Sequence, residues 1–278
     1  MKNLNLREFI RAIRTQAVAD MRPNFLGMGI LGLILAPIGM LLLLKVSLQG
    51  QNADIVKPLT VSLVAAAAAF GIIQICSEIY TERLSGTLLR VRTLPHGPLS
   101  WSIGKSISTL LVTLASQVLI LVGAYFLFPP ANYTATQLAL LIVVMVAAAI
   151  AHTPIGFILG ALFRSPVANL LVYLFALALL GTSGVFFPIT AVPRLLQYVH
   201  TVFPTYWSGH LARYLFMSAD TSWEMGQSYH PLLACLILLG WIIVGYALTA
   251  FTVKRSFRKE SIGALASIQG KVRAQVGL

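Results

Sequence analysis

Long stretches without a charged side chain limit the folds that this chain can adopt. Asp, Glu, Lys and Arg are absent from residues 23–44, 58–77, 106–163, 165–193 and 225–253. Only 10% of the residues are charged and 58% are hydrophobic, whereas about a quarter of an ordinary soluble domain is charged. A soluble domain could not bury so much apolar surface. The chain is therefore predicted to be an all-α polytopic membrane protein, because a spanning helix needs about 20 mainly apolar residues.

The charge-free stretches predict six membrane-spanning helices. The stretch 106–163 is long enough for two of them, and Pro129, Pro130 and Asn132 in its middle favour a turn. The predicted spans are residues 25–47, 59–78, 106–128, 136–163, 168–188 and 232–253. Together they form a six-helix transmembrane domain over residues 25–253.

The segment 189–217 is ambiguous. Its charge-free part contains Gln197, His200, Pro204 and His210, and is too polar and too interrupted for a lipid-facing span. Irregular backbone is tolerated at membrane depth only where protein or water covers its polar groups. We therefore expect an outer re-entrant helical segment here, and not a seventh span.

Basic residues predict the orientation of the chain. With six spans, 16 of the 20 Lys and Arg residues fall on the side that holds both termini, and four fall on the other side. Basic loops are retained in the cytoplasm. Both termini, the loop 79–105 and the basic tail 254–278 are therefore expected there, in a multi-pass protein of the plasma (inner) membrane of a prokaryote.

Residues 1–24 predict an amphipathic helix along the cytoplasmic interface of the membrane. Leu6, Ile10, Ile13 and Ala17 recur at helical spacing, and several arginines fall on the adjoining face. A basic, flexible tail without helical structure is the alternative.

Two glycine-containing stretches resemble nucleotide-binding motifs, but neither fulfils the requirements of its motif. Residues 27–32 match G-x-G-x-x-G but follow no strand, and residues 97–106 have six residues between the glycines where a P-loop needs four. The chain is therefore expected to have no ATP site of its own, no bound cofactor and no catalytic residues. Gly156 and Gly160 instead predict close helix packing, and His152 an interhelical hydrogen bond.

Histidines and acids in the outer segment raise the alternative of a metal-dependent membrane enzyme. Their spacing matches no metal-binding motif, so no metal site is expected. We interpret them as solvated loop residues: His200, His210, Asp220, Glu224 and His230.

Two blocks of sequence resemble a known family. The first, in the loop after the second predicted span, reads Glu82-Arg83, Gly86-Thr87-Leu88, Thr93-Leu94-Pro95 and Gly104-Lys105. The second, in the outer segment, runs from Ser183-Gly184-Val185-Phe186-Phe187-Pro188 to Phe203-Pro204-Thr205-Tyr206. With the six-span plan, these blocks resemble the permease subunits of type-2 ATP-binding-cassette (ABC) exporters of the multidrug or antibiotic-export type. Many relatives carry an acidic residue where this chain has Leu89.

The resemblance implies a permease that moves a hydrophobic or amphipathic small molecule, such as a drug, an antibiotic or a lipid, out of the cell. It implies two copies of a cytoplasmic ABC ATPase that binds ATP and magnesium, and a second permease copy, identical or related. An ion- or proton-coupled secondary transporter is the alternative. It is disfavoured because no charged residue lies in the middle of a predicted span.

The resemblance also implies roles for particular residues. The loop would dock on the ATPase through a short helix at 84–95, with an apolar stripe of Leu84, Leu88 and Val91. Exposed ion pairs of about 0–1 kcal/mol each would position this helix. The residues assigned to coupling are Glu78, Glu82, Arg83, Leu84, Gly86, Thr87, Leu88, Arg90 and Pro95.

The transport path would run between protomers, near the first, second and fifth predicted spans. Its candidate residues are Gln74, Ser77, Asn169, Tyr173, Phe175, Thr182, Ser183, Phe186 and Phe187. Phe186 and Phe187 are expected to form an outer closure.

Overall fold

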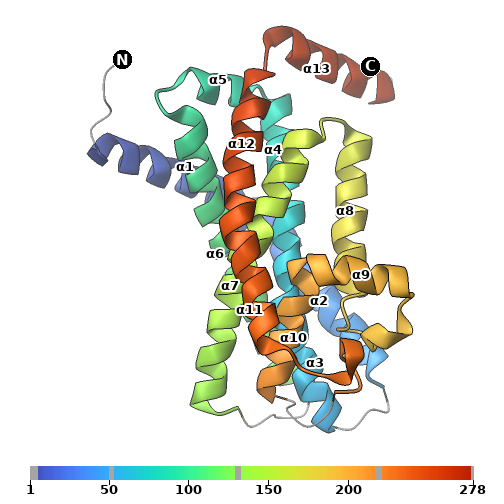
Figure 1. Ribbon diagram of the computed structural model, residues 1–278. Coiled ribbons are helices and arrows are strands. Elements are labelled where there is room, and N and C mark those ends of the chain that lie inside the picture. Colours follow the sequence, from blue (N-terminus) through green and yellow to red (C-terminus); the bar gives the residue numbers. More distant parts are fainter. Residues whose placement is uncertain (1–5, 50–52, 129–132, 217–220, 277–278) are drawn as a thin grey trace.

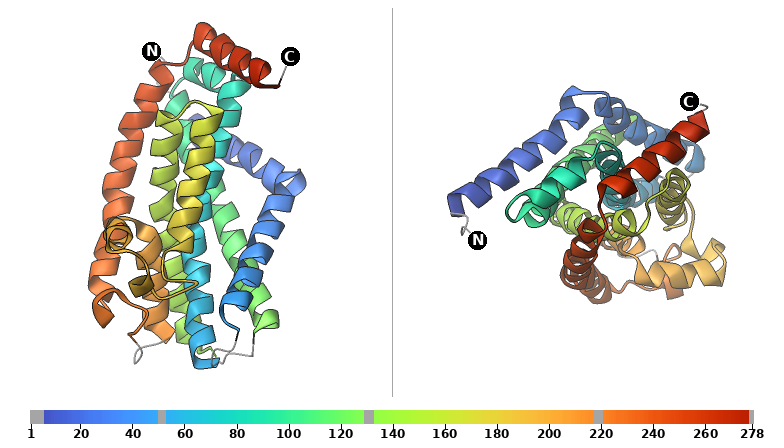
Figure 2. Two further views of the ribbon diagram at one scale, coloured as in Figure 1. Left: turned by 90° about the vertical axis from the view of Figure 1, so that its right-hand side faces the viewer. Right: turned by 90° about the horizontal axis from the view of Figure 1, so that it is seen from above.

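The computed structural model describes residues 6–49, 53–128, 133–216 and 221–276 (Figure 1). Every regular element within these ranges is a helix. The segments of spanning length, which have 19 to 31 residues, run side by side along one axis and form an elongated bundle (Figure 2). The all-α prediction is confirmed for the part of the chain that is described.

Within the described ranges, five helical segments are long and apolar enough to cross a membrane. The second comprises α3 (Ala53–Ala66), the short η1 (Ala67–Ala69) and α4 (Phe70–Leu84), and the last comprises α11 (Pro231–Gly240), η4 (Trp241–Gly245) and α12 (Tyr246–Arg258). The others are single helices: α2 (Gly29–Ser47), α6 (Gly97–Leu127) and α7 (Ala135–Leu162).

The helix at the fifth predicted span is shorter than expected. α8 (Pro166–Gly181) has 16 residues, which at 1.5 Å per residue gives roughly 24 Å, against about 30 Å for the hydrocarbon core. The chain then turns at Gly184, whose φ of +82° lies in the left-handed region that favours glycine. The predicted span at 168–188 therefore ends early, and five segments of spanning length are found where six were expected.

Three short or medium helices mark one end of the bundle, which we call the α5 end. They are α1 (Leu6–Leu26), α5 (Thr87–Thr93) and α13 (Ile262–Val276), and α1 and α13 lie across the bundle axis (Figures 1 and 2). The opposite end, where α3 begins and α10 (Pro204–Phe216) finishes, is the α10 end (Figure 1).

Small residues bring α4 and α7 into close contact, as the sequence predicted. A Cβ atom added at Gly156 would lie 2.9 Å from Ile75 Cβ, and one added at Gly160 would lie 2.8 Å from Ile79 Cδ1. His152 on α7 is buried, and its Nε2 is 3.0 Å from Thr205 Oγ1 on α10, which is the predicted interhelical hydrogen bond.

Two helices separate α8 from the last spanning segment. α9 (Arg194–Val202) follows the short turn η2 (Ile189–Ala191), and α10 then packs against α3 and α7. All residues from Pro204 to Arg213 are buried. The backbone here is helical and covered by protein, which satisfies the polar groups that made the sequence unsuitable as a lipid-facing span.

Candidate coupling site

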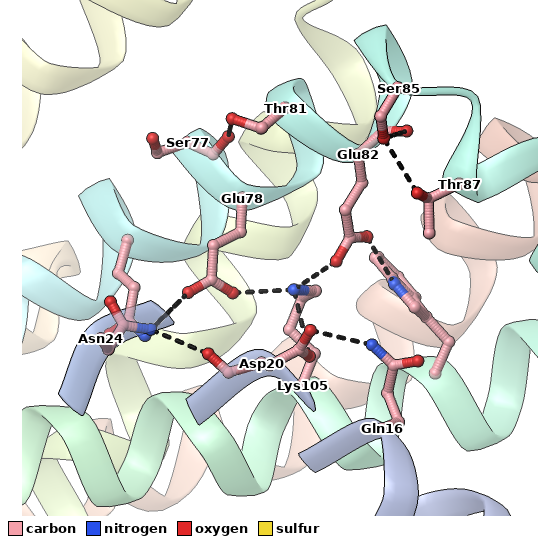
Figure 3. A network of polar contacts seen from close by, with 12 residues as sticks. Gln16, Asp20, Asn24, Ser77, Glu78, Thr81, Glu82, Ser85, Thr87 and Lys105 are labelled. Atoms are coloured by element: carbon pink, nitrogen blue, oxygen red, sulfur yellow. Dashed lines mark hydrogen bonds and ion pairs between the residues drawn. The ribbon is translucent and has the colours of Figure 1, made fainter. Parts of the chain in front are cut away.

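A buried lysine joins three helices near the α5 end. The Lys105 side chain on α6 has no exposed surface, and its Nζ lies 3.2 Å from Asp20 Oδ2, 2.7 Å from Glu78 Oε2 and 2.8 Å from Glu82 Oε1. Asp20 belongs to α1, and the two glutamates belong to α4 (Figure 3). We call these four residues the Lys105 cluster.

The local sequence explains why these side chains meet. Glu78 and Glu82 are four residues apart and share one face of α4. Gly104, directly before the lysine, lets α1 approach α6, because a Cβ atom there would lie 2.7 Å from Gln16 Cβ. The approach of α1 brings Asp20 Oδ2 to within 3.2 Å of the lysine Nζ.

Neutral side chains complete the hydrogen bonds of the three carboxylates. Trp101 Nε1 donates to Glu82 Oε2 at 2.7 Å, and Gln16 Nε2 donates to Asp20 Oδ1 at 2.9 Å. Asn24 Nδ2 and Gln74 Nε2 both donate to Glu78 Oε1, at 3.2 and 3.0 Å.

The cluster has one cation for three acids. Burial raises the pKa of Asp20 above its ordinary value, although the charge of Lys105 opposes this rise. The carboxylate side chains keep 9 to 20% of their surface exposed, so water can reach them. Lys105 contacts all three carboxylates at once, and none of the three is fully buried.

A groove of about 390 Å³ adjoins the Lys105 cluster. Its walls come from α1, α2, α4, α6 and α8, and they are mainly apolar, with Phe70 and Ile73 among the lining residues. Asn24, Gln74 and Glu78 line the groove and also take part in the hydrogen bonds of the cluster. The groove and the Lys105 cluster therefore share Glu78 and two of its hydrogen-bond partners.

A second buried cation, Arg83, ties α4 to the carboxyl-terminal part of the chain. Its Nε lies 3.1 Å from Glu260 Oε1, and its Nη2 donates to the carbonyl oxygen of Gly160 at 3.2 Å. Arg164 Nη2 is 3.2 Å from the same Glu260 oxygen. Beyond Glu260, α13 crosses the α4–α5 junction, where Gln269 Nε2 donates to the carbonyl oxygen of Leu84 at 2.9 Å.

The ion pairs of the loop therefore differ from those expected. Glu78 and Glu82 pair with Lys105, whereas Arg83 pairs with Glu260. The paired side chains keep 0 to 20% of their surface exposed, so breaking one of these pairs should cost more than the roughly 0–1 kcal/mol typical of fully exposed surface pairs.

The α5 helix is anchored by its apolar face. Gly86 precedes it with a φ of +73°, and Leu88 and Val91 lie in a buried cluster with Trp101 and Phe257. Two of the three residues in the predicted apolar stripe are therefore covered by this chain and are not available to a partner. The exposed residues of α5 and the following turn are Arg90, Arg92, Thr93, Leu94, Pro95 and His96.

Three of the nine predicted transport-path residues meet in the groove, and the others lie elsewhere. Gln74, Ser77 and Tyr173 are brought together as lining residues of the groove beside Glu78. Phe175 lies elsewhere, with its ring 5.3 Å from that of Phe203, and Asn169 is half-buried on α8 outside the groove lining.

The remaining candidates belong to the turn after α8. Thr182 Oγ1 is 2.8 Å from His200 Nε2, and buried Ser183 donates to the carbonyl oxygen of Leu180 at 2.7 Å. Phe186 packs against the core, while Phe187 is 39% exposed. These four residues lie apart from the groove.

The outer histidines and acids are not a solvated group, contrary to the sequence interpretation. His200, His210 and Glu224 are buried, with 0 to 1% of their surface exposed, whereas His230 is exposed and Asp220 lies outside the described residues. Within the described ranges, no three His, Cys, Asp or Glu residues could together hold a metal ion.

Arg213 of α10 organises this second cluster, which we call the Arg213 cluster. Its Nη2 donates to Glu224 Oε2 at 3.1 Å, and its Nη1 donates to Ser62 Oγ at 2.6 Å and to the carbonyl oxygen of Gly184 at 3.2 Å. Tyr206 donates to Glu224 Oε2 at 2.8 Å.

Glu224 is held as a carboxylate by these contacts. Burial alone would raise the pKa of Glu224, but the charge of Arg213 and hydrogen bonds from His210 and Arg213 together lower this pKa to about 2. His210 Nε2 accepts a hydrogen bond from the backbone N–H of His230 at 2.9 Å. Its Nδ1 therefore carries the proton donated to Glu224 Oε2, at 2.6 Å, and a neutral imidazole satisfies both contacts.

These observations define a multi-pass, all-helical membrane protein with a polar cluster next to an apolar groove. The sequence profile of the family described as ABC-2 family transporter protein matches residues 36–247. The match covers more than half of the chain, so the protein belongs to this family. It is an ABC-2 permease, the membrane component of a transporter whose family implies association with an ATPase subunit. The comparison with curated proteins gave no match.

Proposed function

We propose that the chain is the permease subunit of an ATP-driven exporter for a hydrophobic or amphipathic small molecule. It would work as a dimer with two copies of a separate ATPase, which binds ATP and magnesium. Family membership supports the permease class. The cargo, the direction of transport and the composition of the complex belong to the proposal.

One observation carries the mechanism: Glu78 belongs to the groove and to the Lys105 cluster at once. A movement that displaces α4 or α1 changes the distances from Lys105 to its three carboxylates. The same movement displaces Glu78 and Gln74 in the wall of the groove. The cluster can therefore transmit a shift at the α5 end to the surface on which a cargo would lie.

The ATPase would dock on the exposed face of α5 and the turn that follows. A groove of about 360 Å³ lies beside this face, between α1 and the start of α6, and is lined by Arg11, Leu94 and Trp101 among others. Arg90 and Arg92 add positive charge next to exposed Leu94. A partner with an apolar ridge and acidic residues would match this surface.

The cargo path would follow the groove between α2, α4 and α8. Its walls are mainly apolar, and Gln74, Ser77 and Tyr173 provide a few polar groups, which suits an amphipathic molecule. A second permease copy facing α2 and α8 would convert the open groove into an enclosed path. Phe187, exposed in the turn after α8, would contribute to the outer closure.

The same proposal sets the orientation in the membrane of a prokaryotic cell. The α5 end would face the cytoplasm, because basic loops are retained there. α1 would lie along that interface, with exposed Leu6 and Ile10 toward lipid. The α9–α10 pair would enter the membrane from outside and return, since α10 ends at the same end of the bundle at which α3 begins (Figure 1).

Affinity purification tests the proposed partnership. The tagged chain is extracted from native membranes in mild detergent, and the co-purifying proteins are identified by mass spectrometry. The proposal predicts a stoichiometric soluble ATPase with a P-loop. A stable monomer or dimer without an ATPase, under conditions that preserve other membrane complexes, would instead favour a secondary transporter.

A pair of matched variants locates the docking surface. Leu94 on the α5 end is 58% exposed, and Leu195 on α9 is 76% exposed. Leu94→Glu should reduce ATPase recovery at least tenfold, because a carboxylate replaces an apolar contact among arginines. Leu195→Glu should leave ATPase recovery unchanged. Equal loss in both variants would show that the ATPase does not bind at α5.

A further inference from the structure

One buried carboxylate at the α5 end joins several helices, and it lies outside the part of the chain that matches the family. Glu260 is located between α12 and α13, whereas the family match ends at residue 247. Its Oε1 is 3.1 Å from Arg83 Nε on α4 and 3.2 Å from Arg164 Nη2 in the turn between α7 and α8. We call these three residues the Glu260 cluster. Neither Glu260 nor Arg164 is among the coupling residues predicted from the sequence.

Glu260 is also connected to α5, the proposed docking helix. Arg92 Nη1 on α5 donates to the backbone carbonyl oxygen of Glu260. The following helix, α13, packs on the residue that precedes α5, because a Cβ atom added at Gly86 would lie 3.2 Å from Leu265 Cδ2. A displacement of α5 therefore acts on the backbone at Glu260, both directly through Arg92 and through α13.

The side chain of Glu260 continues this connection to the start of α8. Its partner Arg164 is held in place by α12, since Arg164 Nη2 donates to the carbonyl oxygen and to the Oγ of Ser256 at 3.0 and 3.1 Å. The next residue, Ser165, caps α8, and its Oγ accepts a hydrogen bond from the backbone N–H of Ala168 at 3.1 Å. Because Arg164 is bonded directly to this cap, a shift of Glu260 moves the first turn of α8.

α8 forms one wall of the groove beside Glu78. Tyr173, about two turns from the start of α8, lines this groove. Glu78 belongs to the opposite wall on α4 and to the Lys105 cluster. The Lys105 cluster thus reaches the α4 wall, and the Glu260 cluster reaches the α8 wall.

From these contacts we infer that Glu260 is a positioning residue that links the docking helix α5 to the α8 wall of the groove. Arg92 holds its backbone, and its carboxylate holds Arg164 and with it the start of α8. Arg83 keeps the end of α7 against α4, because its Nη2 donates to the carbonyl oxygen of Gly160 at 3.2 Å. The inference rests on the proposed docking of an ATPase at α5.

Thiol labelling on α8 tests this link. A chain without Cys76 and Cys235, carrying Tyr173→Cys, is reconstituted with its co-purifying ATPase, and its rate of labelling by a small maleimide is measured with and without ATP and vanadate. ATP should change this rate severalfold. Glu260→Gln, which removes the charge and keeps the size of the side chain, should abolish the change while ATPase recovery and ATP hydrolysis persist. Lys259→Gln, at the neighbouring exposed position, should leave the change intact.

A second variant keeps the test decisive if Glu260→Gln does not fold. Arg164→Gln removes the contact toward α8 and retains the more deeply buried pair of Arg83 and Glu260. It should also abolish the ATP-dependent change in labelling. A merely structural role would lower the melting temperature of these variants and leave the ATP-dependent change of the folded protein intact.

The outcomes separate this inference from the proposed function. An unchanged response to ATP in folded Glu260→Gln or Arg164→Gln, or an equal loss in Lys259→Gln, would overturn the role of Glu260 alone. The absence of any response to ATP in the chain that keeps Glu260, or of a co-purifying ATPase, would overturn the proposed function and the inference with it.

Discussion

The Lys105 cluster and the Arg213 cluster each neutralise a buried cation, but with different sets of carboxylate partners. Arg213 has a single carboxylate partner, Glu224, and both side chains are fully buried. Lys105 has three carboxylate partners, each partly reached by water. The Arg213 cluster would lose its one carboxylate if Glu224 moved, whereas the Lys105 cluster would keep two if one carboxylate moved. The first is suited to hold α10 in place, and the second to accommodate movement between α1, α4 and α6.

The surroundings of the two clusters support this difference. The Arg213 cluster binds together α3, α10 and the turn after α8 through Ser62 and Gly184. The Lys105 cluster lies between an apolar groove and α5, both of which present exposed residues.

Removing the arginine should be the most damaging change. Arg213→Ala leaves Glu224 as a buried carboxylate without its cation, and breaking a buried pair in this way costs about 3–5 kcal/mol. The apparent melting temperature in detergent should fall sharply. Arg194→Ala, at an exposed position on α9, serves as the control and should leave the melting temperature unchanged. A small change in melting temperature in Arg213→Ala would show that the Arg213 cluster does not hold α10 in place.

Removing the lysine should destabilise less and uncouple more. Lys105→Met leaves three carboxylates that retain contact with water, so the cost should be about 1–3 kcal/mol. ATP hydrolysis by the reconstituted complex should continue but lose its link to transport. Glu82→Lys should have the same functional effect, because it places a second cation beside Lys105. Wild-type coupling in both variants would argue against a role for the cluster.

The clusters should respond to pH with opposite signs. The pKa of Glu224 is lowered to about 2 from an ordinary 4.5, so its contribution to stability is complete above pH 4.5 and is lost as the pH falls toward 2. The pKa of Asp20 is raised above its ordinary 3.8, so its ionised form costs stability. Asp20→Asn should therefore raise the melting temperature at pH 7, and this gain should shrink on acidification. A gain that grows on acidification would contradict the assigned sign.

The smallest effect is expected at α13. Gln269→Ala removes one hydrogen bond to the carbonyl oxygen of Leu84, worth about 0.5–1.5 kcal/mol. Hydrogen exchange should accelerate in α13 and at the α4–α5 junction and remain unchanged in α10. Exchange that accelerates over the whole bundle would instead show that α13 stabilises the entire fold.

The sequence predicted the helices better than the contacts between them. Charge-free runs located five spanning segments, and the helical spacing of Gly156 and Gly160 predicted close helix packing, for which the structure identifies α4 as the partner of α7. The shortening of α8 was missed because Thr182-Ser183-Gly184 looked like the end of a span and is instead a turn. Apolar composition does not reveal where a helix stops when the next segment is also apolar.

Buried ion pairs were the main feature that sequence reasoning could not predict. Asp20, Lys105 and Glu78 come from three helices, and only the packing of α1 on α6 brings them together. Lys105 belongs to the first of the two sequence blocks that resemble the family, yet its position in that block did not identify its carboxylate partners. Glu224 and His210 looked like solvated loop residues because their burial depends on α10, which folds back into the bundle. At the Lys105 cluster, the glycine directly before the lysine, Gly104, was a sequence signal of close helix packing.

The central claim is that the Lys105 cluster transmits ATP-driven movement from the α5 end to the groove. A chain without Cys76 and Cys235, carrying Ser77→Cys in the groove, is reconstituted with its co-purifying ATPase, and the thiol labelling rate is measured with and without ATP and vanadate. We predict that ATP changes this rate severalfold, that Lys105→Met abolishes the change while hydrolysis persists, and that Lys254→Met preserves it. An unchanged response to ATP in Lys105→Met would contradict the account.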